Sequence, residues 1–270
     1  MPLTQEQQEA VRMGTPIEWN GLTLFPILMK DYNRFIIAQM GLTAQQQTLP
    51  SKYVVMRYLE ALYALDYDVR TNGGPQGGFF SRILLFLMLS LRLEVRKGLD
   101  GEEYIPIGIQ TEKDNPRKLT ALEVTQGEVS VEITPQNFVQ LREILASQNE
   151  VELPDETLNA ELVQAERDLA TKSSLNLVPD SEALIYSVSV KTQIPVEDIF
   201  QWTVRRFVLT ERAIDRITGH LVAALSEAAG AKYKNGNPWP SWKYDRDKHS
   251  SALVSLAELT QRLSGSVEAR

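Results

Sequence analysis

The side chains best suited to catalysis or metal binding are few in this sequence and stand far apart. Histidine, whose imidazole carries protons or binds metals near neutral pH, occurs only as His220 and His249. No nucleophile or second metal ligand stands at a recognisable spacing from either histidine. Asp245-Arg246-Asp247 has the carboxylate spacing of some metal–nucleotide sites, but such a tripeptide arises readily by chance. We therefore expect no catalytic site, no metal site and no cofactor.

A glycine-rich segment, residues 73–78, is the one candidate for phosphate binding. Backbone N–H groups of such segments bind phosphate when the segment joins a parallel strand to a helix and ends in Gly-Lys-Ser or Gly-Lys-Thr. Here the segment ends in Gly-Gly-Phe and follows a predicted helix. We therefore interpret it as a flexible break between two helices.

The composition favours a protein partner over a nucleic acid or a membrane. The chain has 270 residues, of which 43% are hydrophobic, and a net charge of −7 at pH 7. Such a chain buries a core, and its negative charge argues against broad binding to nucleic acids or anionic membranes. Cysteine is absent, which excludes disulfides and thiolate chemistry, and the polar N-terminus differs from a secretory signal. We expect a cytoplasmic protein.

The strongest structural signal is a single long helix predicted over residues 194–230. Pro195 suits the first helical turn, Glu197 places negative charge at the positive end of the helix dipole, and Gly230 ends the helix. One side of this helix is apolar and is predicted to face the core: Phe200, Val204, Phe207, Val208, Ile214, Leu221, Val222 and Leu225. Glu211 interrupts this side, so we expect it at the edge of the contact or beside a basic partner.

The opposite side of the same helix is the most unusual surface that the sequence predicts. It combines arginines with two large apolar residues: Trp202, Arg205, Arg206, Leu209, Arg212, Ala213 and Arg216. Because Trp and Arg are frequent interface anchors, we assign a surface for an acidic protein or peptide to Trp202, Arg205, Arg206, Leu209 and Arg216. The alternative is that another helix of the chain covers Trp202 and Leu209 while the arginines stay solvated.

A second candidate for binding follows the long helix, in residues 237–242. Trp239 and Trp242 stand among prolines in Asn-Pro-Trp-Pro-Ser-Trp, a stiff segment whose rings can cover an apolar surface. Two interpretations are open at this point. Either the segment locks the tail onto the long helix, or it docks on an external partner with Trp239 and Trp242 as binding residues.

The remaining pattern predicts a mostly helical α+β protein with a small antiparallel sheet. Asn20-Gly21 predicts a type I′ turn in a β-hairpin, and alternation of apolar and polar residues predicts three strands over 103–111, 118–126 and 128–134. Helices are expected over 27–40, 51–68, 79–95, 136–149, 157–170 and 253–263, with another from residue 181. The helix over 79–95 is the most apolar, yet its uninterrupted apolar run is about half of a membrane span, so we predict a central buried helix.

These elements fall into four regions along the chain. They are an N-terminal helical region with the hairpin (1–98), the antiparallel β segment (99–133), a C-terminal helical domain (134–236) and a Trp/Pro-rich tail with a terminal helix (237–270).

Several blocks of the sequence resemble tail-region proteins of bacteriophages and prophages from Gram-positive bacteria. The blocks are ITPQNFVQLREILASQN, VELPDETLNAELVQAERDLA, IPVEDIFQWTVRRF and NPWPSW, which lie within residues 133–242. The resemblance implies a tail assembly chaperone, a helical protein that binds the tape-measure protein and helps tail-tube subunits polymerise around it. It also implies phage tail proteins as partners and the host cytoplasm as location, and a homo-oligomer stays an open option.

The length of the chain and its β segment keep two other functions open. The first is a structural component of the phage tail or baseplate, which would stay in the virion. The second is an enzyme with a site that the sequence does not reveal.

Overall fold

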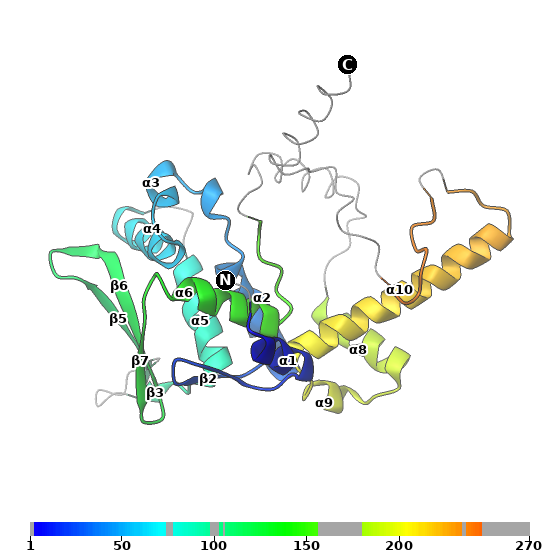
Figure 1. Ribbon diagram of the computed structural model, residues 1–270, viewed down its shortest axis with the longest axis horizontal. Helices are drawn as coiled ribbons and strands as arrows, with labels where there is room; N and C mark the ends of the chain where they lie inside the picture. Colours follow the sequence, from blue (N-terminus) through cyan, green and yellow to red (C-terminus); the bar gives the residue numbers. More distant parts are fainter. Residues whose placement is uncertain are drawn as a thin grey trace, which may run out of the picture. The chain divides into compact units, whose positions relative to one another are not determined.

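The computed structural model describes residues 3–73, 78–97, 103–104, 106–155, 180–233 and 236–244. It confirms a mostly helical α+β protein with a small antiparallel sheet between helical regions of the chain (Figure 1). Two compact units are formed, unit 1 by Met1–Pro154 with Phe200–Arg206 and unit 2 by Asp155–Ile199 with Phe207–Arg270. The β segment thus shares a unit with the N-terminal helices, which differs from the four expected regions. The helices expected over 157–170 and 253–263 lie outside the described residues.

Unit 1 combines short helices with two-stranded ribbons and a three-stranded sheet. The helices described in it are α1 (Gln5–Met13), α2 (Tyr32–Leu42), α3 (Ser51–Val54), α4 (Tyr58–Asn72), α5 (Phe79–Leu91) and α6 (Phe138–Gln148). The strands are β1 (Ile17–Trp19), β2 (Leu22–Leu24), β3 (Arg96–Lys97), β4 (Glu103–Tyr104), β5 (Ile107–Glu112), β6 (Asn115–Gln126) and β7 (Val129–Ile133). Unit 2 holds α8 (Ser181–Thr192), α9 (Val196–Ile199) and α10 (Val204–Ala228), whose first turn belongs to unit 1.

The predicted hairpin and sheet are both present. Asn20 and Gly21, between β1 and β2, have φ angles of 49° and 88°, the positive values that a type I′ turn requires at both central positions. In the sheet, β6 pairs antiparallel with both β5 and β7. Leu122 on β6 is fully buried, and the Tyr63 hydroxyl of α4 donates to the Pro116 carbonyl of β6 over 3.0 Å. The sheet therefore packs against α4.

The most apolar helix, α5, is buried in the centre of unit 1, as the sequence predicts. Ile83, Phe86 and Leu87 are fully buried, and α2 packs along this helix (Figure 1). Gly41 on α2 permits the close approach, because a Cβ at this position would come within 2.7 Å of the Ile83 backbone nitrogen. Among the described residues, no helix is both long and apolar enough to cross a membrane.

The carboxylate of Asp66 joins α4 to the start of α5. This buried side chain accepts hydrogen bonds from the Gly78 amide at 2.8 Å and the Phe80 amide at 3.1 Å. Amides in the first turn of a helix have no partner within the helix, and the helix dipole favours negative charge there. The glycine-rich segment separates two helices, as predicted, and its residues 74–77 lie outside the described range.

The prediction of one helix over residues 51–68 is wrong, because α3 and α4 are separated by a break at residues 55–57. The side chain of Gln46 stabilises this break. Its Nε2 donates to the Tyr53 carbonyl at 3.0 Å and to the Met56 carbonyl at 2.6 Å. The amide thus replaces hydrogen bonds that a continuous helix would make within itself.

The prediction of one helix over residues 194–230 is also wrong, because residues 200–203 separate α9 from α10. These residues pair with residues 27–30 in the manner of two short antiparallel strands. The Met29 amide, for example, donates to the Trp202 carbonyl over 2.9 Å. Hydrogen bonds to a distant part of the chain therefore outweigh the local helix propensity.

Recognisable caps begin and end α10. The Thr203 side-chain oxygen accepts from the Arg206 amide at 3.1 Å, and the Val204 amide donates outside the helix to the Ile27 carbonyl at 2.8 Å. At the other end Gly230 has a φ of 92°, the left-handed backbone that commonly closes helices. The predicted end of the helix is thereby confirmed.

The side chain of Gln126, at the end of β6, behaves like an additional peptide group beside β2. Its Oε1 accepts from the Thr23 amide at 2.8 Å, and its Nε2 donates to the Thr23 carbonyl at 2.9 Å. The same nitrogen donates to the Leu91 carbonyl at 3.0 Å, at the end of α5. One side chain thus links the sheet, the hairpin and the central helix.

Two further amide side chains, at the end of α6, complete this arrangement. Gln148 donates to the Leu24 carbonyl at 3.0 Å, and the Asn149 side-chain oxygen accepts from the Ile27 amide at 2.8 Å. Both side chains are essentially excluded from solvent. Because buried backbone groups are costly without partners, these bonds fix the path of the chain after β2.

We predict that Gln126→Glu lowers the free energy of unfolding by about 2 kcal/mol, because a carboxylate cannot donate to the Thr23 and Leu91 carbonyls. Urea titration followed by circular dichroism measures this change. Gln5→Glu, the same chemical change at the exposed start of α1, should leave stability nearly unaltered. Equal losses in both variants would contradict the role assigned to Gln126.

Candidate functional site

The Trp/Arg surface predicted on the long helix is divided between the two units. Trp202 is only 7% exposed and belongs to unit 1, where the Arg206 guanidinium stacks over its ring at 4.1 Å. Arg205 forms an ion pair with Glu150 and donates to the Ser147 carbonyl at 3.4 Å. The chain itself therefore covers Trp202. Trp202 is a packed core residue and not an exposed interface anchor.

The other predicted binding residues lie in unit 2. Leu209 is 40% exposed on α10. The Arg216 Nε donates to the Trp242 carbonyl at 3.1 Å, and the His220 Nδ1 lies 2.9 Å from the Trp239 carbonyl. The Trp/Pro-rich segment thus lies along α10, with its indole rings partly exposed. Arg216, Trp239 and Trp242 are brought together in unit 2, whereas Trp202 belongs to unit 1.

A glycine within α10 receives the indole ring of Trp239. A Cβ at Gly219 would stand 2.6 Å from an atom of this ring, so only glycine leaves room for the contact. The Trp239 amide also donates to the Asn237 side-chain oxygen at 2.8 Å, and the Asn237 Nδ2 donates to Glu227 at 3.1 Å. The contact between the tail and α10 therefore has both an apolar and a polar part.

We predict that Gly219→Ala displaces the tail from α10. Alanine favours a helix over glycine by about 1 kcal/mol, so an effect on the helix alone would be stabilising. Displacement of Trp239 should instead expose the chain near Lys243 and raise the rate of trypsin cleavage there severalfold, as followed by mass spectrometry. Thr218→Ala changes the neighbouring, exposed position and should leave the rate unchanged. Equal rates in both variants would disprove the packing role of Gly219.

An exposed apolar row, here called the α10 row, occupies the C-terminal half of α10. It consists of Ile217, Leu221, Val222 and Leu225, which are 43%, 57%, 58% and 71% exposed. By contrast, Val204 and Phe207 in the first turn are buried. The sequence pattern predicts that the whole apolar side of the helix faces the core. This prediction is wrong for the C-terminal half of α10, where the apolar side chains are exposed. Periodicity shows which side of a helix is apolar and not how much of its length is covered.

Two carboxylates stand close together before the α10 row, on Glu211 and Asp215. Burial raises the pKa of Glu211 above its ordinary value, the charge and hydrogen bond of Asp215 raise it further, and Arg212 lowers it by a smaller amount. Glu211 is half-buried, which agrees with the expected position at the edge of the apolar contact. The pair is a local source of negative charge beside exposed apolar side chains.

We predict that Glu211 makes the fold less stable at pH 7 than at pH 4. Because its pKa is raised on folding, its contribution to stability is fully present below the unfolded pKa and is lost as the pH rises through the folded pKa. Glu211→Gln should remove this loss and raise the free energy of unfolding at pH 7 by less than about 1 kcal/mol, since solvent screens the partly exposed pair. Unfolding in urea at both pH values tests this. A pH dependence of stability that Glu211→Gln leaves unchanged would contradict the assignment.

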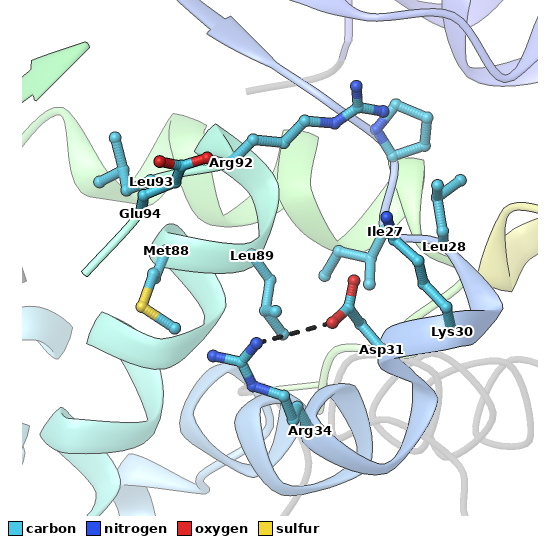
Figure 2. A pocket seen from close by; sticks show the side chains of 11 residues that line it. Ile27, Leu28, Lys30, Asp31, Arg34, Met88, Leu89, Arg92, Leu93 and Glu94 are labelled. Atoms are coloured by element: carbon cyan, nitrogen blue, oxygen red, sulfur yellow. Dashed lines mark ion pairs between the residues drawn. The ribbon is translucent and has the colours of Figure 1, made fainter.

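A cleft of about 280 Å³ lies in unit 1, between residues 26–34 and the end of α5 with the residues after it (Figure 2). Met88 and Leu89 supply an apolar wall, and the Arg34 guanidinium is turned toward the Asp31 carboxylate at 3.6 Å. No pattern in the sequence predicts this cleft, because its two sides are far apart along the chain and neither carries a motif. Only the packing of α2 along α5 brings them together.

Of the residues first considered for catalysis, the structure describes only His220. His220 contacts the tail through its Nδ1, while His249 and Asp245-Arg246-Asp247 lie outside the described residues. In the part of the chain that the structure describes, no group of three or more His, Cys, Asp or Glu side chains is arranged to hold a metal ion. No protein-family model, curated protein or solved structure matches this chain.

Proposed function

We propose that this chain binds other proteins during the assembly of a bacteriophage tail, as a tail assembly chaperone for tape-measure or tail-tube proteins in the host cytoplasm. The proposal assigns no catalytic step to it. The phage context is supported by the sequence blocks that resemble tail-region proteins. The binding role is supported by one structural observation, the exposed α10 row.

The α10 row has the spacing that helix partners use. Leu221 and Leu225 are one turn apart and stand on the same side of α10, with Ile217 one turn before them. Burying one such side chain against a partner contributes about 1.5–3 kcal/mol. Two or three of these side chains therefore supply a useful share of the binding free energy. An amphipathic helix is the partner whose side chains interdigitate with this spacing.

A structural component of the tail or baseplate is the second candidate. It is favoured by the three-stranded sheet β5–β6–β7, which a simple helical chaperone does not need. The two candidates differ in where the protein resides after assembly, because a chaperone leaves and a component stays.

The first test is quantitative mass spectrometry of this protein in purified phage particles and in the crude lysate of the producing cells. We expect the protein in the lysate and its depletion from the particles. A constant ratio to the tail-tube protein in particles would support the structural candidate instead. Absence of the protein from every phage-producing lysate would remove the phage role altogether.

The second test asks whether the α10 row is the binding surface. Leu221→Asp with Leu225→Asp should reduce recovery of the tape-measure protein in a pull-down about tenfold or more, with an unchanged melting temperature because both side chains are exposed. Tyr186→Asp with Val190→Asp is the matched control, an exposed apolar pair at the same spacing on α8. Equal losses from both pairs would show that the α10 row is not the surface.

A further inference from the structure

The cleft of unit 1 is small, and part of its lining is exposed. Pockets for small molecules usually enclose about 300–1,000 Å³, and this cleft holds about 280 Å³. Several of the side chains that line it, among them Lys30, Arg34 and Arg92, are themselves exposed. A segment that lies over the surface and inserts one or two side chains therefore suits it better than an enclosed ligand.

The inner surface of the cleft is apolar. Ile27 and Met88 are buried beneath it, while Leu89 and Leu93 are partly exposed along its wall. In Figure 2, Leu89 lies between the Arg34–Asp31 pair and Arg92. An aliphatic side chain that entered here would exchange water for contacts with these residues.

The charged groups around the cleft are mostly positive, although the whole chain carries a net charge of −7. Asp31 and Arg34 form an ion pair at 3.6 Å and largely neutralise each other. Of the remaining charges, Lys30 and Arg92 are positive and Glu94 is negative. Among the described residues, neither Lys30 nor Arg92 has a carboxylate within ion-pair distance.

The Arg92 guanidinium is held in place in a way that leaves it able to bind an anion. It lies over the Phe25 ring at 4.1 Å, and its backbone has a φ of 51°, which ends α5. Stacking on an aromatic face uses the flat side of the guanidinium and leaves the N–H groups in its plane for hydrogen bonds. These donors match the geometry of a carboxylate.

We propose that this cleft binds an acidic peptide segment of a partner protein, with an aliphatic side chain against Met88 and Leu89 and a neighbouring carboxylate beside Arg92 and Lys30. The site lies in unit 1 and does not involve the α10 row. Its failure therefore leaves the proposed function intact, and failure of the α10 row leaves the cleft intact. A basic segment would meet Lys30 and Arg92 at the rim, against one carboxylate outside the Asp31–Arg34 pair, that of Glu94, and is therefore disfavoured.

The test uses the full chain and two fluorescein-labelled peptides of equal length, one alternating aspartate and leucine and the other alternating lysine and leucine. Fluorescence anisotropy should show binding of the acidic peptide, weakening with added salt, and much weaker binding of the basic peptide. Equal binding of both peptides would overturn the proposal.

Variants locate the binding. Lys30→Gln with Arg92→Gln should weaken binding of the acidic peptide about fivefold to tenfold, as expected for the loss of two partly exposed charge contacts. Arg12→Gln with Lys118→Gln removes the same charge from other exposed positions of unit 1 and should have little effect. If the control pair weakened binding as much, general charge attraction would explain the result and the cleft would be excluded.

Two further measurements test the apolar part and the kind of ligand. Leu89→Ala should weaken binding of the acidic peptide severalfold without changing the salt dependence of that binding. Full retention of affinity would show that no side chain of the peptide enters the cleft. Hexanoate, a free aliphatic carboxylate, should displace the peptide only weakly because it lacks the backbone and the neighbouring side chains of a peptide. Displacement at equal affinity would assign the cleft to a small acid and contradict the peptide.

Discussion

The architecture of unit 1 depends on hydrogen bonds to the backbone N–H and C=O groups from β2 through residue 30. This stretch is surrounded by α5, α6 and β6, so its backbone groups need partners within the protein. Only part of it pairs with another strand. The rest is served by the amide side chains of Gln126, Gln148 and Asn149, and by the carbonyl of Ser90, which accepts from the Phe25 amide at 2.7 Å. A buried backbone group without a partner costs roughly 1–3 kcal/mol, so several such groups together outweigh the net stability of many domains.

The same requirement decides where α10 begins. The amides of Met29 and Lys30 donate to the carbonyls of Trp202 and Phe200 at 2.9 and 3.1 Å, and those carbonyls are therefore unavailable to a continuous helix. Because the helix is broken here, Trp202 is buried in the core of unit 1 and Thr203 caps the start of α10. A surface that helical periodicity would assemble from Trp202 and the following arginines is thus divided, because residues 200–203 form hydrogen bonds with residues 27–30.

The features that the sequence predicts correctly are those that neighbouring residues determine. Asn20-Gly21 fixes its turn because both residues tolerate positive φ, and the apolar content of α5 requires burial wherever the chain places it. The helix breaks at residues 55–57 and 200–203 were not predictable from the sequence. They depend on hydrogen bonds to Gln46 and to residues 27–30, respectively, and no sequence pattern identifies these residues as hydrogen-bond partners. The cleft was missed for the same reason. It exists only because α2 packs along α5 through Gly41, a glycine that carries no signal of its role.

The two surfaces proposed for binding differ in charge, and this difference has a physical consequence for partner choice. Beside the α10 row, Glu211 and Asp215 repel each other, and a cation on a partner would relieve that repulsion while its apolar side covers the row. At the cleft, Lys30 and Arg92 instead favour a carboxylate. Lys30 and Arg92 outnumber Glu94 at the cleft, whereas a carboxylate pair precedes the α10 row, and charge selects against the wrong segment more strongly than apolar area does. Under the two proposals, an acidic segment suits the cleft, and a segment that carries a cation beside its apolar side suits the α10 row.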